Sequence, residues 1–287
     1  MKNFFYIFLS FLFSYPTLLP AKALVFPSPS SVFVPVSQHQ DGEDTDTEID
    51  VPSRKNASAF GIDVSHYQGV IDWERVKTSG QHPVEFAYIK ASQGITIQDD
   101  CYQRNIAEAR RAGILVGSYH YFSSGGTGIE QCDYFMETIK DFPQDLVPVV
   151  DVEECPRSWG PMALCRNLRD FLLRMEQVYG IRPIIYSGIF FYNNYLAHEF
   201  RDYTLFIARY ADEAPITADG ADWVIWQFSE RGRIDGIRHK VDLDCINGNY
   251  SLDDILLHKL YRYPRSDKKG KPHVHPNQLP PDAGLMP

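Results

Sequence analysis

Residues 146–154 read Leu146-Val-Pro-Val-Val-Asp-Val-Glu-Glu154, an apolar run that ends in acidic side chains. Apolar residues at successive positions are typical of a strand buried on both faces, as in a parallel sheet covered by helices. Residues two apart on a strand share a face, so Asp151 and Glu153 point the same way. The stretch predicts a buried parallel strand with two carboxyl groups at its carboxyl end.

Similar apolar runs lie on either side of this stretch and alternate with helical patterns. The other strand-like runs are residues 86–89, 114–117, 183–186 and 204–208, and the helical patterns are 102–112, 130–140 and 163–179. This alternation predicts an α/β fold, and a closed barrel if the strands number eight. Residues 223–228 and 240–244 read as strands with almost no helix between them, so the final strands are expected to be partly antiparallel.

The two ends of the 287-residue chain differ in composition from its middle. Residues 1–23 combine a lysine, an apolar run and Ala21-Lys-Ala23, which predicts a cleaved signal peptide and a secreted or periplasmic protein. Residues 24–58, rich in Pro, Ser and acidic side chains, and residues 264–287, rich in Pro and Lys, are expected to be disordered. Residues 59–263 remain as one folded domain, and we expect no membrane span after signal cleavage.

Composition excludes some classes of function. The chain has 28 Lys and Arg against 37 Asp and Glu, a formal net charge of -9. Nucleic-acid binding needs clustered positive charge, so the balance argues against such a partner. No CxxC pair or HExxH pattern is present, which argues against a zinc site. Aromatic residues make up 14% of the chain, which fits a large core or a groove for a sugar or a base.

Export would allow the five cysteines to pair. They are Cys101, Cys132, Cys155, Cys165 and Cys245. Cys155 and Cys165 bracket a short loop and are the first candidates for a disulfide, with Cys101 and Cys132 as the second.

The acidic residues at the strand end suit the cleavage of a glycosidic bond. An α/β barrel carries its catalytic groups at this end of its strands. The reaction needs a proton donor for the leaving oxygen and an anion to stabilise the cationic ring. We expect the charge of Asp151 to raise the pKa of Glu153, which suits a general acid. A helix N-cap or a solvated cluster is the alternative. Asp63 and Asp242 are either paired in the core or directed into a cleft.

Eight motifs follow one another along the domain. They are Gly61-Ile-Asp-Val-Ser-His-Tyr-Gln-Gly, Tyr88-Ile-Lys-Ala-Ser-Gln-Gly, Gly117-Ser-Tyr-His-Tyr-Phe, Pro148-Val-Val-Asp-Val-Glu, Pro183-Ile-Ile-Tyr-Ser-Gly, Phe206-Ile-Ala-Arg-Tyr, Ile225-Trp-Gln-Phe and Gly236-Ile-Arg-His-Lys-Val-Asp-Leu-Asp-Cys. From about Phe60 to Leu257 the chain closely resembles the glycoside hydrolase family 25 lysozymes, the N-acetylmuramidases of Chalaropsis type. The resemblance implies an irregular TIM-like barrel with five β/α units and final strands that pair differently. It also implies cleavage of the β-1,4 bond between N-acetylmuramic acid and N-acetylglucosamine in peptidoglycan, without metal or organic cofactor.

The resemblance assigns roles to individual residues. Glu153 is the general acid, Asp151 its partner, and Asp63 and Asp242 are the other two carboxylates of the cleft. Substrate contacts are expected from the cleft positions Lys90, Tyr119, Tyr186, Tyr210 and Trp226. The partner that this implies is a peptidoglycan glycan strand, and we expect a monomer.

Two motifs depart from the usual family pattern. Lys-Ala-Thr-Glu-Gly reads Lys90-Ala-Ser-Gln-Gly here, which loses an acidic charge beside the cleft. Val-Asp-Leu-Asn-Val-Phe reads Val241-Asp-Leu-Asp-Cys-Ile, which gains one at Asp244, and Cys245 is expected to be a buried thiol. Two rival hypotheses stay open: a catalytically silent peptidoglycan-binding protein of the same fold, and a chitinase-like glycosidase, although the DxxDxDxE string of barrel chitinases is absent.

Overall fold

The structure is a computed structural model that describes residues 57–80 and 83–260. The predicted signal peptide (1–23), the C-terminal tail (264–287) and nearly all of the predicted linker (24–58) lie outside the described residues. Among the helices of the described part, none is long and apolar enough to cross a membrane.

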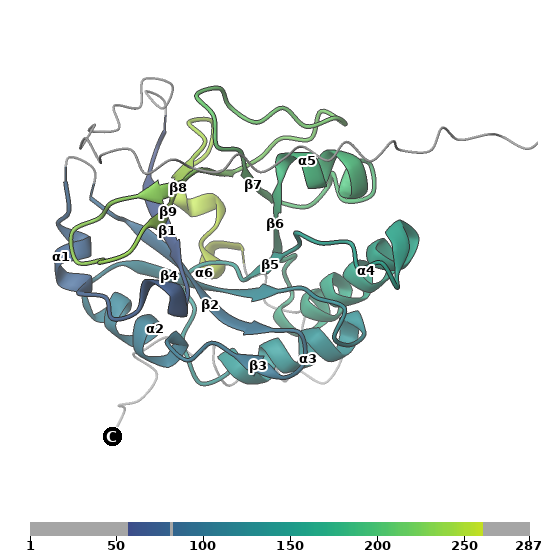
Figure 1. The fold of residues 1–287 in the computed structure, drawn as a ribbon, viewed down its shortest axis with the longest axis horizontal. Coiled ribbons are helices and arrows are strands. Elements are labelled where there is room, and N and C mark those ends of the chain that lie inside the picture. Colours follow the sequence, from purple (N-terminus) through teal and green to yellow (C-terminus); the bar gives the residue numbers. More distant parts are fainter. Residues whose placement is uncertain (1–56, 81–82, 261–287) are drawn as a thin grey trace, which may run out of the picture. The chain divides into compact units, whose positions relative to one another are not determined.

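Eight strands of the described residues close into a barrel, and a ninth, short strand pairs beside the end of one of them (Figure 1). The ring is formed by β1 (Phe60–Val64), β2 (Phe86–Gln93), β4 (Leu115–Tyr121), β5 (Val149–Asp151), β6 (Ile184–Gly188), β7 (Leu205–Ala208), β8 (Ile225–Gly232) and β9 (Val241–Ile246). The short β3 (Ile97–Gln98) pairs with the end of β2. The sheet order β1-β9-β8-β7-β6-β5-β4-β2-β3, with an additional β1–β2 pairing, closes the ring. The predicted α/β barrel is confirmed.

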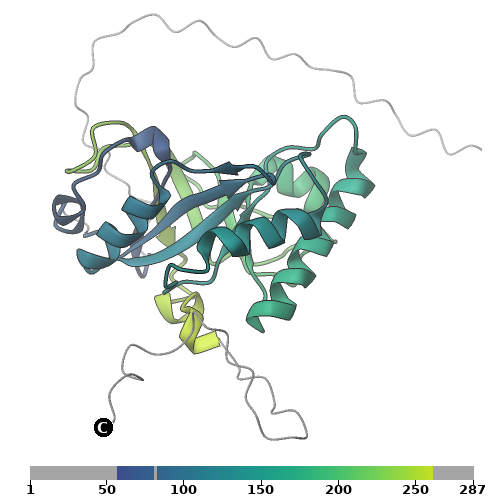
Figure 2. The same ribbon diagram turned by 90° about the horizontal axis from the view of Figure 1, so that it is seen from below.

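Helices follow five of the strands. They are α1 (Trp73–Lys77), α2 (Tyr102–Arg111), α3 (Gly128–Ile139), α4 (Gly160–Tyr179) and α5 (Ile189–Phe191). Five β/α units therefore run from β1 to α5, as predicted. Gly180 ends α4 with a left-handed φ of 70°, which a glycine adopts without steric cost. Figure 2 shows the teal helices α3 and α4 lying along the outside of the sheet.

The last three strands have no α-helix between them among the described residues. β7 and β8 are parallel, but β9 is antiparallel to both β8 and β1. Antiparallel neighbours need only a short connection, whereas parallel ones need a crossover. The predicted antiparallel closure is confirmed. The remaining elements are the short 3-10 helices η2 (His66–Gln68) and η4 (Leu252–Asp254), the short π-helix η3 (Tyr192–Leu196), and α6 (Leu257–Leu260).

The strand that carries the acidic pair begins later than the apolar run suggested. β5 starts at Val149, and Leu146 instead forms an isolated bridge to Leu256. Pro148 has no N–H to donate to a neighbouring strand, which accounts for the late start. Three residues are still enough to place Asp151 at the carboxyl end of β5.

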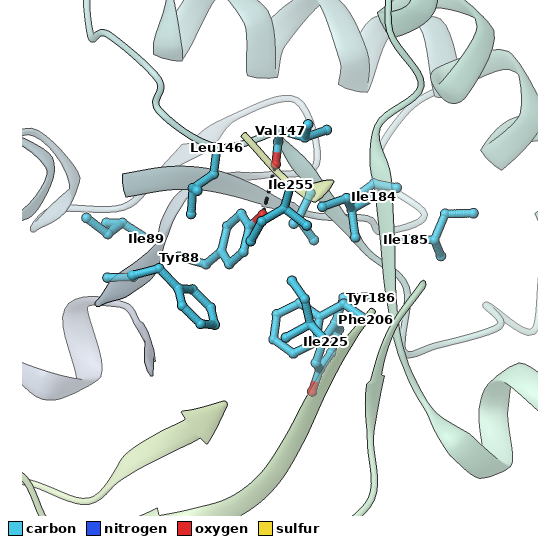
Figure 3. Close-up of a cluster of buried hydrophobic side chains, with 14 of the residues drawn as sticks. Tyr88, Ile89, Leu146, Val147, Ile184, Ile185, Tyr186, Phe206, Ile225 and Ile255 are labelled. Carbon is cyan, nitrogen blue, oxygen red and sulfur yellow. Dashed lines mark hydrogen bonds between the residues drawn. The ribbon is translucent and has the colours of Figure 1, made fainter. Parts of the chain in front are cut away.

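Large apolar side chains fill the middle of the barrel (Figure 3). The hydroxyl of Tyr88 donates to the carbonyl of Val147 at 3.1 Å, the contact dashed in Figure 3. The rings of Tyr186 and Phe206 meet edge to face, with their centroids 5.0 Å apart. Buried aromatic residues pack tightly here, so the polar side chains at the carboxyl ends of the strands rest on a rigid core.

The predicted disulfides are absent from the structure. Cys101, Cys132, Cys155 and Cys165 are free thiols. The Cys165 thiol donates to the carbonyl of Tyr195 at 3.3 Å, and the Arg104 guanidinium lies 3.3 Å from the Cys101 sulfur. Each predicted pair thus has a member that is engaged elsewhere, while Cys132 and Cys245 are buried.

Candidate active site

A cavity of about 280 Å³ lies at the carboxyl ends of the parallel strands. All eight strands of the ring contribute to its wall, through Asp63, Val64, Tyr88, Lys90, Tyr119, Tyr121, Val149, Asp151, Tyr186, Phe206, Gln227, Glu230 and Asp242. Glu153, Tyr210 and the turn residues Ser65, Tyr67 and Gln68 complete it. This end of an α/β barrel is where such folds carry their functional groups.

Strand register places the acidic pair against β6. Asp151 is the last residue of β5 and lies opposite Tyr186. Val152 is fixed on both sides, because its N–H donates to the Tyr186 carbonyl at 2.9 Å and its carbonyl accepts from the Ser187 hydroxyl at 2.8 Å. Glu153 therefore continues the alternation of the strand and lies on the cavity side with Asp151. The predicted shared face is observed.

Asp151 and Glu153 both line the cavity, and their carboxyl groups influence each other electrostatically. Carboxyl groups that share a site hold a proton more tightly than they would in water. Burial raises the pKa of Asp151 well above its usual range, and the charge of Glu153 raises it further. Lost hydration also raises the pKa of Glu153, while the charge of Lys90 opposes this rise. The pKa of Glu153 is raised, as predicted, but the cause is lost hydration and not the charge of Asp151.

Lys90 is the basic side chain of the cavity wall. Its ammonium donates to Gln93 at 3.0 Å and lies 4.8 Å from the centre of the Tyr121 ring. Burial lowers the pKa of Lys90, and the charges of Asp151, Asp99 and Glu153 oppose this. Gln93 stands where the family pattern usually has Glu, so Lys90 has a neutral hydrogen-bond partner there and its charge is directed to the carboxyl pair.

Gln227 is hydrogen bonded to cavity residues from two other strands, Asp63 on β1 and Tyr186 on β6. Its side-chain nitrogen Nε2 donates to Asp63 at 2.6 Å. Its oxygen Oε1 accepts from the hydroxyls of Tyr186 at 2.8 Å and Tyr210 at 2.7 Å. A hydrogen-bonded path therefore runs from Asp63 on β1 through Gln227 to Tyr186 on β6 and to Tyr210.

Asp63 and Asp242 lie opposite each other on β1 and β9. Burial raises the pKa of Asp63 well above its usual range, and the charge of Asp242 adds to this. Burial and the charge of Glu230 raise the pKa of Asp242 to about 6. The site is thus crowded with carboxyl groups that hold protons more tightly than they would in water.

The structure brings together eight of the nine site residues predicted from sequence. Asp63, Asp151, Glu153, Asp242, Lys90, Tyr119, Tyr186 and Tyr210 all line the cavity. Trp226 does not: its side chain is buried, and its indole N–H donates to the Arg209 carbonyl at 2.8 Å. Within residues 57–80 and 83–260, no group of three or more His, Cys, Asp and Glu side chains is arranged to hold a metal ion.

Sequence reasoning missed Gln227, Tyr121 and Glu230. Strand alternation contained the signal for two of them. Tyr121 lies two residues after Tyr119 on β4, and Gln227 follows Trp226 on β8, so it faces the opposite side of the sheet. Glu230 lies beyond a register shift in β8, where alternation no longer predicts direction.

Comparison with known proteins identifies the family. The model for glycosyl hydrolases family 25 matches residues 62–237. This chain belongs to glycosyl hydrolase family 25. The motif resemblance is thereby confirmed, and with it the assignment as a glycoside hydrolase of lysozyme type.

Relatives of this family 25 chain include characterised and uncharacterised proteins. The uncharacterized protein YegX of Escherichia coli K12 is 39% identical over 191 residues, which is 66% of this chain and 69% of YegX. Lysozyme M1 of Streptomyces globisporus is 32% identical over 209 residues, covering 66% and 68%. The crystal structure of a bacterial lysozyme from Streptomyces coelicolor matches with a TM-score of 0.63 and 29% identity, covering 71% of this chain and 98% of that one. A family 25 glycosyl hydrolase from Bacillus anthracis matches with a TM-score of 0.61 and 26% identity, covering 75% and 99%.

Proposed function

We propose that this chain is a peptidoglycan hydrolase that cleaves the β-1,4 bond between N-acetylmuramic acid and N-acetylglucosamine, with Glu153 as the general acid. The observation that carries the proposal is the pair of carboxyl groups, Asp151 and Glu153, that lines the cavity at the carboxyl end of β5. The lysozyme relatives of family 25 support the substrate.

Glu153 meets two requirements of the acid. Its side chain is exposed at the cavity, so a leaving oxygen can reach it. The protein around its carboxyl group removes part of the hydration of the charged form, which raises its pKa, so Glu153 keeps a proton at a pH where an ordinary glutamate has lost it. Asp151 is almost fully buried, which suits a group that orients the bound sugar and does not donate a proton to the leaving oxygen.

We propose that the reaction is assisted by the substrate, a recognised alternative to the scheme with two catalytic carboxylates. Asp151 and Glu153 lie on one face at the end of β5 and line the same cavity. The 2-acetamido group of the substrate then attacks the anomeric carbon, and Asp151 orients and polarises it. Attack forms the new carbon–oxygen bond as the glycosidic bond breaks, and the leaving oxygen takes the Glu153 proton.

The surroundings of the pair fit a polymeric glycan. A second hollow, of about 380 Å³, shares Tyr210 and Glu230 with the cavity, so the two adjoin along the surface. Tyr210 and Tyr67 are largely exposed and offer flat faces on which sugar rings can stack. Tyr119, which is partly exposed, and Lys90 are proposed as polar contacts to the bound sugar.

The release of reducing ends from purified peptidoglycan tests this function. Activity on peptidoglycan, with none on chitin oligomers that lack muramic acid, supports it. Activity on chitin oligomers supports the chitinase-like alternative, and tight binding of peptidoglycan without release supports the catalytically silent one.

We further propose that the protein acts outside the cytoplasm, as a monomer and without nucleic acid. The support is in the sequence: residues 1–23 have the signal-peptide pattern, and the net charge is -9. The intact mass of the protein recovered from culture medium or periplasm tests cleavage after Ala23.

A further inference from the structure

The loop that joins β8 to β9, residues 233–240, carries exposed basic side chains. Gly232 pairs with Val241 where the two strands meet the loop, so Arg233 and Lys240 are the first residues beyond this pair on either side. Both side chains are exposed, and so is that of Arg238. The loop therefore gathers three Lys and Arg residues in a chain whose net charge is -9.

These three cations have no carboxylate partner. The acidic residue of the loop, Asp235, lies 3.8 Å from Arg75, which belongs to α1. Among the described residues, Arg233, Arg238 and Lys240 take part in no salt bridge. Arg233 and Lys240 stand at the same level of a hairpin, where like charges opposite each other are destabilising. An anion bound between them would relieve this repulsion.

The backbone of the loop is fixed against α1, beside which the olive loop lies in Figure 1. The N–H of Asp72 donates to the Gly236 carbonyl at 2.9 Å, and the N–H of Asp235 donates to the Ser79 hydroxyl at 2.8 Å. Gly236 has a φ of 94°, and a Cβ there would lie 2.3 Å from the Asp72 carbonyl oxygen. Ile237 is buried. A loop held in this way presents its basic side chains from a fixed backbone, which lowers the entropy cost of binding.

The loop adjoins the wall of the cavity. Gln68 lines the cavity, and its side-chain nitrogen Nε2 donates to the Lys240 carbonyl at 3.0 Å. Asp242, two residues after Lys240, also lines the cavity. The backbone of Lys240 is thus next to two cavity residues from different strands of the chain. A polymer that leaves the cavity on this side passes the exposed cations of the loop.

The cavity itself is poorly suited to an anionic ligand. Its acidic lining residues are Asp63, Asp151, Glu153, Glu230 and Asp242, and Lys90 is the basic one. Cations at the edge of such a cavity attract a negatively charged substrate and offset the repulsion from the acidic groups. An arginine guanidinium also matches a carboxylate in shape and can bind it through two parallel hydrogen bonds.

We propose that the β8–β9 loop binds the carboxylates of the stem peptides of peptidoglycan, through Arg233 and Lys240, while the glycan lies in the cavity. The stem peptide is attached to the lactyl group of N-acetylmuramic acid, so it is carried to the edge of the cavity by the same strand that is cleaved. The inference rests on the proposed function for the identity of the polymer.

Removing the two charges and removing the peptide test the same contact from both sides. The test variant is the double substitution Arg233→Gln with Lys240→Gln. The matched control is Arg111→Gln with Lys140→Gln, because these side chains are exposed at the C-terminal ends of α2 and α3 and lie outside the cavity. KM and kcat are measured on soluble glycan strands that carry stem peptides, and on the same strands after an amidase has removed the peptides. Both substrates are freed of teichoic acid and lipid, so that phosphate is not the anion measured.

We expect the test variant to raise KM about three- to tenfold on peptide-bearing strands, as the loss of two exposed charged contacts predicts, with kcat unchanged. KM on bare strands should not move, and the control should match the wild type on both. Added salt should raise the wild-type KM on peptide-bearing strands, because it screens exposed charges, and should affect the test variant less.

Two results would overturn the proposal. One is an unchanged KM of the test variant on peptide-bearing strands. The other is an equal rise on bare strands, which keep only the lactyl carboxylate, because the loop would then bind charge on the sugar itself. If the wild type cleaves neither substrate, the proposed function fails. The Kd of fluorescently labelled strands, measured by anisotropy with the same proteins, then decides the inference by the same comparison.

Discussion

Replacing Glu153 by glutamine removes the proton of the proposed acid and little else. The two side chains have the same shape, and Glu153 is exposed, so no core contact is lost. Its raised pKa means that the charged form is disfavoured in the folded protein. The neutral amide should therefore leave the melting temperature unchanged or slightly higher.

The expected loss of turnover follows from the role of the donor. A positioned general acid is worth about 10²–10⁴-fold in rate, which is about 2.7–5.4 kcal/mol of barrier at 1.36 kcal/mol per tenfold. Asp151 is almost fully buried, so it is badly placed to protonate a leaving oxygen that lies next to the exposed Glu153. We therefore expect kcat to fall by at least about 10²-fold, with KM changed little.

The assay is the initial rate of reducing-end release from purified peptidoglycan at saturating substrate. Glu154→Gln is the matched control, because this neighbouring glutamate is exposed but does not line the cavity. It should keep a kcat near the wild-type value. Near-wild-type turnover of Glu153→Gln would refute the assignment of the acid, and a loss confined to Glu154→Gln would transfer the role to Glu154.

Three further predictions concern pH and packing. Lost hydration raises the pKa of Glu153, and a general acid works only while it is protonated, so kcat should fall as pH rises through that pKa. The Glu153→Gln variant should lack this alkaline limb. Wild-type activity that climbs steadily to about pH 9 would count against the assignment. The raised pKa of Asp242, about 6, means that the folded state binds its proton more tightly than the unfolded state, so stability falls as pH rises from about 4 to 6. Asp242→Asn should remove this loss, and a melting-temperature difference from wild type that does not grow over that range would contradict it. A Cβ at Gly128 would lie 1.8 Å from the Asn167 carbonyl oxygen, so Gly128→Ala should lower the free energy of unfolding in urea by about 1–3 kcal/mol, whereas Gly125→Ala, with no contact below 3.4 Å, should not.

Much of the fold could be predicted because its signals are local. Buried parallel strands are apolar throughout, so these strands and the three longer helices α2, α3 and α4 could be predicted from the sequence, whereas the short α1 and α5 carry no such signal and the five β/α units were implied by the family resemblance. The late start of β5 depends on a single missing N–H at Pro148, which an apolar run does not reveal. The missing disulfides depend on where the cysteine side chains point, which spacing does not determine.

The site was predictable where it follows from strand alternation and from the family motifs. Asp151 and Glu153 were placed correctly because residues two apart share a face. Trp226 was chosen in place of Gln227 because an aromatic ring suits a sugar, although the two adjacent residues of β8 must face opposite sides. The raised pKa of Glu153 arises from lost hydration, and the hydrogen bond from Gln227 to Asp63 joins strands that are far apart in the sequence, so no local pattern contains either.

The identity of the new reducing end tests the central claim most directly. Purified peptidoglycan is digested with the wild type and with Glu153→Gln, the products are reduced with borohydride, and mass spectrometry identifies the reduced sugar. We expect reduced N-acetylmuramic acid with the wild type and almost none with Glu153→Gln. Reduced N-acetylglucosamine, or equal release by the two proteins, would contradict it.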